Sequence, residues 1–168
     1  VEAIGVSSGT DGLVLALMAL GIGPGDEVVT PPTSWISTAE AVSLVGATAV
    51  WADIDARTYH LRPDALRAAL SPATRAVIAV SLFGAAVDAP ALRAVLDAHT
   101  AAAAAGGGDR RPIALIEDGA QSFGATSPAG VRSCCPGAAA GVTVGVTSAV
   151  GRRGSAVGSC CFSCAPPC

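Results

Sequence analysis

The sequence contains no lysine, because all ten of its basic residues are arginine. None of its side chains is therefore a primary amine. Cysteine is absent from the first 133 residues, and all six cysteines lie between Cys134 and Cys168. We expect no secretion signal and therefore no disulfide scaffold.

Charge and long apolar runs are scarce as well. The net charge is -3 and only 14% of residues are charged, so nucleic acid and anionic membranes are poor partners. The first apolar run, residues 13–23, is too short and too rich in glycine to span a bilayer. At 168 residues the chain is long enough for one domain, and we expect a cytoplasmic protein.

In the first 125 residues, stretches with the apolar spacing of a helix alternate with short apolar runs typical of buried strands. Helical spacing and cap residues predict helices over 7–22, 34–46, 62–70 and 88–100. Short apolar runs predict strands within 25–32, 47–55, 74–84 and 112–119. Strands that alternate with helices and are apolar on both faces indicate an α/β fold, with a mostly parallel sheet between two helical layers.

Two segments interrupt this rhythm. Residues 101–112 are a low-complexity stretch of alanine and glycine, and we expect a solvated insert there. Residues 127–160 have no clear period and few charges, and we assign them no secondary structure and expect disorder.

Candidate functional residues are those beyond the carboxyl ends of the predicted strands, where open parallel sheets bind ligands. Taken singly, an aspartate there is more often a cap or turn former. The candidates are Pro32 to Trp35, Asp53, Asp55, Ser81, Phe83, Gly84 and Asp118 to Gln121.

Three of these features together indicate a cofactor. The stretch "SSGTDGL" opens a helix, and the free amides there suit a phosphate, although the glycine motifs of nucleotide folds are absent. Trp35 could stack on a flat ring, and a buried Asp118 could hold a pyridine nitrogen protonated. These parts describe a site for pyridoxal phosphate (PLP).

The stretches "VSSGTDGLVLALMALGIGPGDEVVTPPTSWISTAEAVSLVGATAVWADID" and "IEDGAQSFGA" resemble the sugar aminotransferases of the DegT/DnrJ/StrS type. Those enzymes have fold type I and depend on PLP, and the resemblance runs over residues 3–126. It implies a partial PLP-dependent transferase large domain over 1–126, incomplete, with three α/β/α layers and a mostly parallel sheet. It also implies contacts to the cofactor, from Gly9, Thr10 and Asp11 to its phosphate, from Trp35 to the ring face, from Asp118 to the ring nitrogen and from Gln121 to the phenolic oxygen.

The last residues, "CFSCAPPC" (161–168), resemble a degenerate form of the family motif that ends in the Schiff-base lysine. Ser163 falls on the family's phosphate-binding serine, and Cys168 falls on the lysine position. A thiol cannot form an imine, so we predict that the chain as written is inactive. Ser81 stands where the family commonly has histidine.

The resemblance implies a fragment of a homodimeric enzyme that transfers an amino group from glutamate to a nucleotide-linked keto-sugar. Two alternatives remain within the family: a lysine-free pseudoenzyme or scaffold that binds PLP weakly or not at all, and a relative of the deoxysugar dehydratases, which carry histidine at the lysine position. His60 and His99 lie far from that position, and we expect both at the surface. The spacing from Cys160 to Cys168 disfavours a zinc or redox module, and we expect no metal site.

Overall fold

The computed structural model describes residues 2–107, 111–122, 124–127, 130, 142–150 and 156–164. They form one mixed sheet of seven strands in the order β1-β7-β6-β5-β4-β2-β3. The strands are β1 (Glu2–Val6), β2 (Glu27–Thr30), β3 (Thr48–Trp51), β4 (Thr74–Val80), β5 (Ala114–Asp118), β6 (Val142–Val150) and β7 (Ala156–Cys164). Strands β2 to β6 run parallel, whereas β7 is antiparallel to both of its neighbours, β6 and β1.

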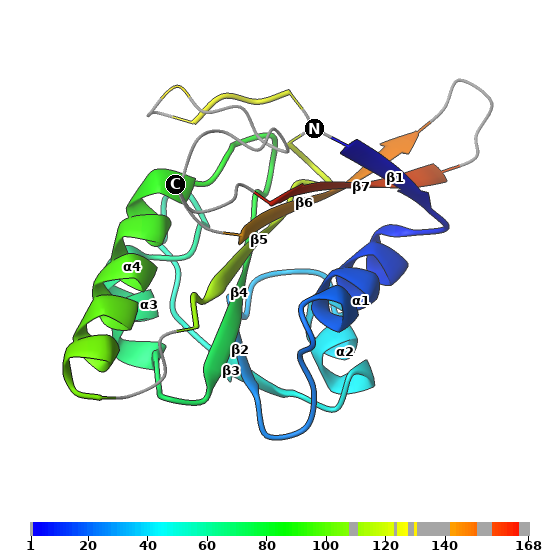
Figure 1. Ribbon diagram of the computed structural model, residues 1–168. Helices are drawn as coiled ribbons and strands as arrows, with labels where there is room; N and C mark the ends of the chain where they lie inside the picture. Colours follow the sequence, from blue (N-terminus) through cyan, green and yellow to red (C-terminus); the bar gives the residue numbers. More distant parts are fainter. Residues whose placement is uncertain are drawn as a thin grey trace.

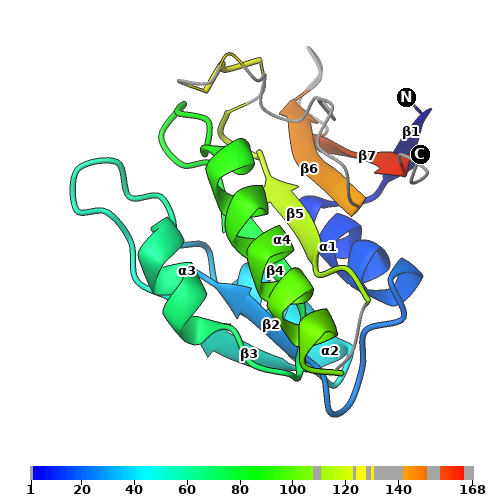
Figure 2. The ribbon, with the colours of Figure 1, turned by 60° about the vertical axis from the view of Figure 1, so that its left-hand side comes forward.

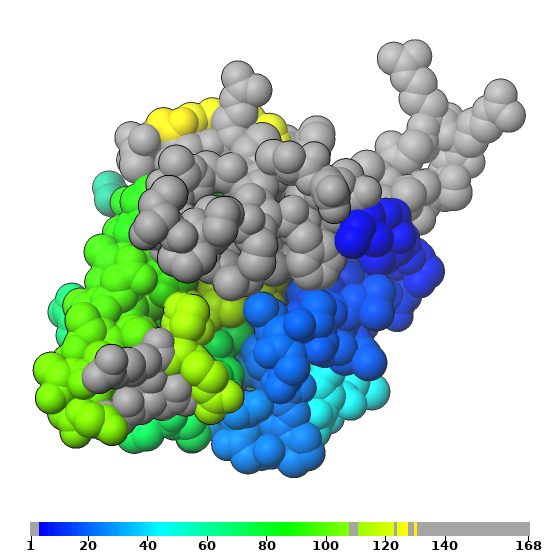
Figure 3. All heavy atoms as spheres, viewed as in Figure 1, coloured from blue at the N-terminus to red at the C-terminus, as the bar shows by residue number. Residues whose placement is uncertain are grey.

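Helices cover both faces of this sheet. Figures 1 and 2 show α1 and α2 on one side and α3 and α4 on the other. The helices are α1 (Gly9–Ala19), α2 (Ser37–Leu44), α3 (Pro63–Ala69) and α4 (Ala89–Ala105). In the space-filling view, the green surface of α4 and the blue surface of α1 form opposite flanks of the molecule (Figure 3). The predicted α/β fold with three layers is thus confirmed.

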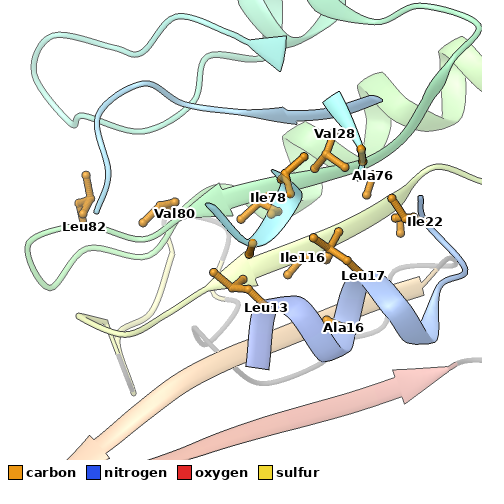
Figure 4. Packing of buried hydrophobic residues seen from close by; sticks show 14 residues of the cluster. Leu13, Ala16, Leu17, Ile22, Val28, Ala76, Ile78, Val80, Leu82 and Ile116 are labelled. Carbon is orange, nitrogen blue, oxygen red and sulfur yellow. The ribbon is translucent and has the colours of Figure 1, made fainter. Parts of the chain in front are cut away.

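The core divides into two clusters because successive strand residues point to opposite faces. In β4, Ala76, Ile78 and Val80 pack with α1 and α2, whereas Val77 and Ala79 pack with α3 and α4. Figure 4 shows the first cluster, which contains buried side chains from both α1 and the sheet. Burial on both faces explains why β4 reads as a continuous apolar run.

Two segments differ from the sequence-based predictions. Helix α4 continues to Ala105, so the first five residues of the predicted insert 101–112 are helical. These five are all alanine, the strongest helix former, which extends a helix that tertiary packing has already nucleated.

Strands β6 and β7 both lie largely in the segment 127–160, for which no secondary structure was predicted. That assignment was wrong for these two stretches. Glycine, serine and alanine are frequent in both stretches, so neither has a clear alternation of apolar and polar residues. The strands form because β6 pairs with β5 and β7 pairs with β1, and such pairing cannot be read from a local pattern.

Candidate cofactor site

Helix α1 begins at the carboxyl edge of the sheet. In Figure 4, Leu13 of its first turns lies toward Val80 and Leu82, whereas Ile22 beyond its last turn lies toward Ala76. The amides at the start of α1 and the carboxyl ends of β4 and β5 therefore share one edge. Ligands of open α/β sheets bind at this edge.

Ser8 caps the start of α1. Its backbone is extended, and its hydroxyl accepts a hydrogen bond from the amide of Asp11 at 3.1 Å. The first bond within the helix runs from the amide of Gly12 to the carbonyl of Ser8. Among the described residues, the amides of Gly9 and Thr10 have no hydrogen-bond acceptor, so two donors at the positive end of the helix stay free for an anion.

The carboxylate of Asp11 faces the serines of its own turn. It accepts hydrogen bonds from the hydroxyl of Ser7 and, at 2.9 Å, from that of Ser8. These bonds lower the pKa of Asp11. The side chain of Asp11 thus fixes the cap, and a direct contact between Asp11 and a phosphate remains a prediction.

Replacing Ser8 with alanine should destabilise the protein by about 1 kcal/mol, because the cap of α1 is lost. Urea unfolding at neutral pH measures this change.

The same substitution should alter the pH dependence of stability. Because the pKa of Asp11 is lower in the folded state than in the unfolded state, its carboxylate stabilises the folded protein above the unfolded pKa. This stabilisation is lost as pH falls through the folded pKa. The Ser8→Ala variant should therefore lose less stability on acidification than the wild type, and equal pH profiles would contradict the role of Ser8.

Asp118 ends β5 on the side of the sheet that α1 covers. Its neighbour Ile116 packs in the α1 cluster, and residues two apart in a strand point to the same face. Burial raises the pKa of Asp118, and the nearby Glu117 carboxylate adds to the rise, although a hydrogen bond from the amide of Ala120 opposes it. Among the described residues no cationic side chain pairs with Asp118.

Gln121 lies in the turn after β5 and contacts the loop after β4. Its Oε1 accepts a hydrogen bond from the amide of Phe83 at 2.9 Å. This contact leaves the NH₂ group of Gln121 as the end that can donate to a ligand. The predicted role of Gln121 at a phenolic oxygen requires such a donor.

The sequence pattern did not reveal a buried contact behind this site. The carboxylate of Glu117 accepts a hydrogen bond from the hydroxyl of Ser81 at 2.6 Å, and the same hydroxyl accepts one from the amide of Val87 at 3.1 Å. The amide of Ser81 also donates to the carbonyl of Asp118 at 2.9 Å. Ser81 was a candidate as a strand-end residue and as the position where the family commonly has histidine, and the one signal for Glu117 was a second carboxylate beside Asp118.

The remaining candidates are at the same edge. Some are exposed to a ligand, and others form hydrogen bonds within their own loop. Trp35 follows β2 and is 79% exposed, so its ring is free to cover a ligand rather than part of the core. Asp55 holds its own turn by accepting hydrogen bonds from the amides of Thr58 and Arg57, which also lower its pKa. Asp53 bonds to the amide of Ile54. These two aspartates therefore shape their loop.

Ser163 lies in β7, where its backbone pairs with Thr143, and its side chain is outside the described part of the structure. Cys168 is outside the described residues altogether. In the described part of the chain, no group of three metal-ligating side chains is found. No described helix is long and apolar enough to cross a membrane.

Two hollows lie away from the predicted cofactor contacts. One, of about 350 Å³, lies between α4 and the start of β4 and includes His99. The other, of about 560 Å³, lies beside the loops after β3 and β4 and includes His60. Both histidines are partly buried and partly exposed, as residues that line surface hollows are. His60 comes directly before Leu61, which forms an isolated antiparallel bridge with Ile54.

Residues 1–144 match the DegT/DnrJ/EryC1/StrS aminotransferase family over most of the chain. The chain belongs to this family. The UDP-2-acetamido-2-deoxy-3-oxo-D-glucuronate aminotransferase of Pseudomonas aeruginosa is 47% identical over 131 residues, which are 78% of this chain and 33% of that protein. The resemblance inferred from the motifs is thus confirmed.

Solved structures of aminotransferases share the fold. DesV of S. venezuelae, solved with a ketimine intermediate, is 34% identical with a TM-score of 0.75, over 95% of this chain and 39% of DesV. NtdA of Bacillus subtilis, solved with the bound cofactor PMP, is 25% identical with a TM-score of 0.71, over 95% of this chain and 33% of NtdA. The family members are PLP-dependent enzymes of fold type I, and this chain spans about a third of the length of these relatives.

Proposed function

We propose that this chain carries the noncovalent part of the PLP site of an aminotransferase for nucleotide-linked keto-sugars. The observation that carries the proposal is Asp118, a carboxylate with a raised pKa that no described cation compensates. A protonated pyridine nitrogen would supply the missing positive charge. The free amides of Gly9 and Thr10 begin the helix that covers the same face of the sheet.

The residues present fit the cofactor in chemical type. The helix amides would hold its phosphate, the exposed Trp35 would cover one ring face, and the NH₂ group of Gln121 would donate to its phenolic oxygen. Ser163 would add a hydroxyl at the phosphate. When bound, the cofactor supplies an electron sink for carbanions, and Asp118 keeps that sink effective by holding the ring nitrogen protonated.

The substrate proposal derives from the relatives. The P. aeruginosa relative is named for a UDP-linked 3-oxo sugar acid, so a keto-sugar nucleotide is the proposed amino acceptor. Glutamate is the proposed donor, and the complete enzyme is proposed to be a cytoplasmic homodimer. These three points extend the family resemblance to this chain.

The 168 residues contain no lysine. This absence affects the covalent chemistry of the reaction and leaves the noncovalent contacts to the cofactor unchanged. No side chain here is an amine that can form an imine with the cofactor aldehyde and then move the proton as such a lysine does. We therefore propose that these residues alone bind PLP reversibly and do not transfer amino groups. This behaviour is that of a pseudoenzyme, which is the alternative that the composition favours.

Borohydride reduction after incubation with PLP should leave no cofactor attached to any side chain. Intact-mass spectrometry with peptide mapping measures the attachment, and a DegT-family enzyme that contains lysine is the positive control. A cofactor adduct mapped to a residue after the amino terminus would contradict the proposal. Conversion of a keto-sugar nucleotide with glutamate, above a control without protein, would also contradict it.

A further inference from the structure

Gln121 carries the single side-chain carboxamide of the chain, because the sequence contains one glutamine and no asparagine. Its backbone lies in the turn 119–122, where the amide of Ser122 donates to the carbonyl of Gly119 at 3.0 Å. The side chain is exposed, and exposed side chains change rotamer within picoseconds to nanoseconds. The hydrogen bond from the amide of Phe83 to Oε1 therefore decides whether the carboxamide keeps one orientation.

The amide of Phe83 belongs to a tight turn in which the residue type is unusual. The amide of Ala85 donates to the carbonyl of Leu82 at 3.0 Å and closes the turn. Between them, Phe83 has a φ of 56° and Gly84 a φ of 79°. Positive φ at both central positions is typical of a type I′ turn, where glycine, asparagine and aspartate are favoured. Phenylalanine is strained at the first position, because its Cβ comes too close to the following carbonyl oxygen.

Tyr59 contacts the ring of Phe83 from a second loop. Its φ of 61° is also left-handed, and no other described residue except Phe83 and the glycines has a positive φ. The two rings meet edge to face with centroids 5.4 Å apart, which is an attractive geometry. Tyr59 is 43% exposed and Phe83 is 70% exposed, so burial in the core does not explain their conformations. The ring contact stabilises both left-handed conformations together.

These contacts form one path along the carboxyl edge of the sheet. It runs from Tyr59 in the loop after β3, through Phe83 in the loop after β4, to Gln121 in the turn after β5. Because the amide of Phe83 is a donor, Gln121 turns its oxygen toward this amide and its NH₂ group away from it. Without this donor the carboxamide would be free to flip, and its oxygen cannot donate to a phenolic oxygen.

We propose that Tyr59 and Phe83 are positioning residues for Gln121. The ring pair fixes the turn 82–85, the amide of Phe83 fixes Oε1, and the NH₂ group of Gln121 is left to donate to the phenolic oxygen of PLP. The inference rests on the proposed function, because it explains how the donor that this function requires keeps its orientation. It also gives two strained, exposed aromatic residues a role that core packing does not supply.

The test is NMR of the whole ¹⁵N-labelled chain, in which Gln121 gives the single pair of carboxamide signals. Without cofactor, the order parameter of its NH₂ group should approach that of rigid backbone, about 0.85, in the wild type and fall below about 0.6 in Tyr59→Gly. Glycine tolerates a positive φ, so this variant removes the ring without adding strain. Tyr59→Asn, which also suits a left-handed turn, should have the same effect.

Two control variants separate the ring contact from other effects of substitution. Tyr59→Phe keeps the ring and should keep the order parameter of the NH₂ group. Trp51→Ala removes another exposed aromatic side chain, one that lies outside the path, and should keep it too. The same order parameter in the wild type, Tyr59→Gly and Tyr59→Asn would overturn the role of Tyr59.

Addition of PLP tests the inference separately from the proposed function. One of the two NH₂ proton signals of the wild type should move downfield, and Tyr59→Gly should bind PLP about tenfold more weakly, as expected for one lost hydrogen bond. A loss of order in Tyr59→Gly without weaker PLP binding would overturn the proposed link from Tyr59 to the cofactor. No PLP binding by the wild type would overturn the proposed function, and the order parameter measured without cofactor would still decide whether Tyr59 positions Gln121.

Discussion

Replacing Asp118 with asparagine should weaken PLP binding by roughly two to four orders of magnitude. Loss of one partner from a buried ion pair costs about 3–5 kcal/mol, which corresponds to that range of affinity. The reason is that asparagine cannot balance the charge of a protonated ring nitrogen. Quenching of tryptophan fluorescence on titration with PLP measures the affinity, because Trp35 is exposed at the same edge.

The same substitution should not destabilise the protein without cofactor at neutral pH. Because the pKa of Asp118 is higher in the folded state, the protonated carboxyl stabilises the folded protein. This stabilisation is complete below the unfolded pKa and is lost as pH rises through the folded pKa. An asparagine side chain has no proton to lose, so the variant should keep its stability over that pH range. Asp53→Asn, an exposed carboxylate beyond β3, is the control and should change neither property. Equal PLP affinity in the wild type and in Asp118→Asn would contradict the role of Asp118.

Replacing Ser81 with alanine should destabilise the protein by roughly 2–4 kcal/mol, because two buried groups lose a partner at once. Glu117 loses the hydroxyl that donates to it, and the amide of Val87 loses its acceptor. The hydroxyl links the ends of β4 and β5, and the backbone of Ser81 binds Asp118. Urea unfolding measures the loss.

Two further variants separate this hydrogen bond from a general effect of removing a hydroxyl. Ser43→Ala alters an exposed serine on α2 and should change stability by less than about 0.5 kcal/mol. In a Glu117→Gln background, Ser81→Ala should cost less, because a bond to a neutral amide is weaker than one to a carboxylate. The same cost in both backgrounds would show that Ser81 does not act through the charge of Glu117.

Much of the fold could be predicted from the sequence, because the local sequence pattern and the tertiary packing favour the same elements. The serine cap, apolar spacing and terminal glycine of α1 all predict one helix, and the structure has it at Gly9–Ala19. The apolar run before Asp118 likewise predicts a buried strand that ends in a carboxylate. Position along a strand then placed Trp35, Asp118 and Gln121 at one edge, since parallel strands end together.

The rest depends on contacts between distant residues. Strands β6 and β7 have a weak pattern of their own, and their pairing with each other, β5 and β1 creates them. The bond between Ser81 and Glu117 spans 36 positions, and the Tyr59–Phe83 contact joins two separate loops. Such contacts cannot be read from a local sequence pattern. The residues that form them were therefore predicted only as candidates or were not predicted at all.

The most direct test of the proposed cofactor site is the protonation state of bound PLP. Pyridoxal phosphate labelled with ¹⁵N at the pyridine nitrogen is added to the chain at pH 8, and its ¹⁵N chemical shift is recorded. If Asp118 holds the ring nitrogen, the shift of the bound cofactor will be that of a protonated pyridine, and in Asp118→Asn it will not. A bound cofactor with an unprotonated nitrogen, or no binding at all, would contradict the assignment of this site.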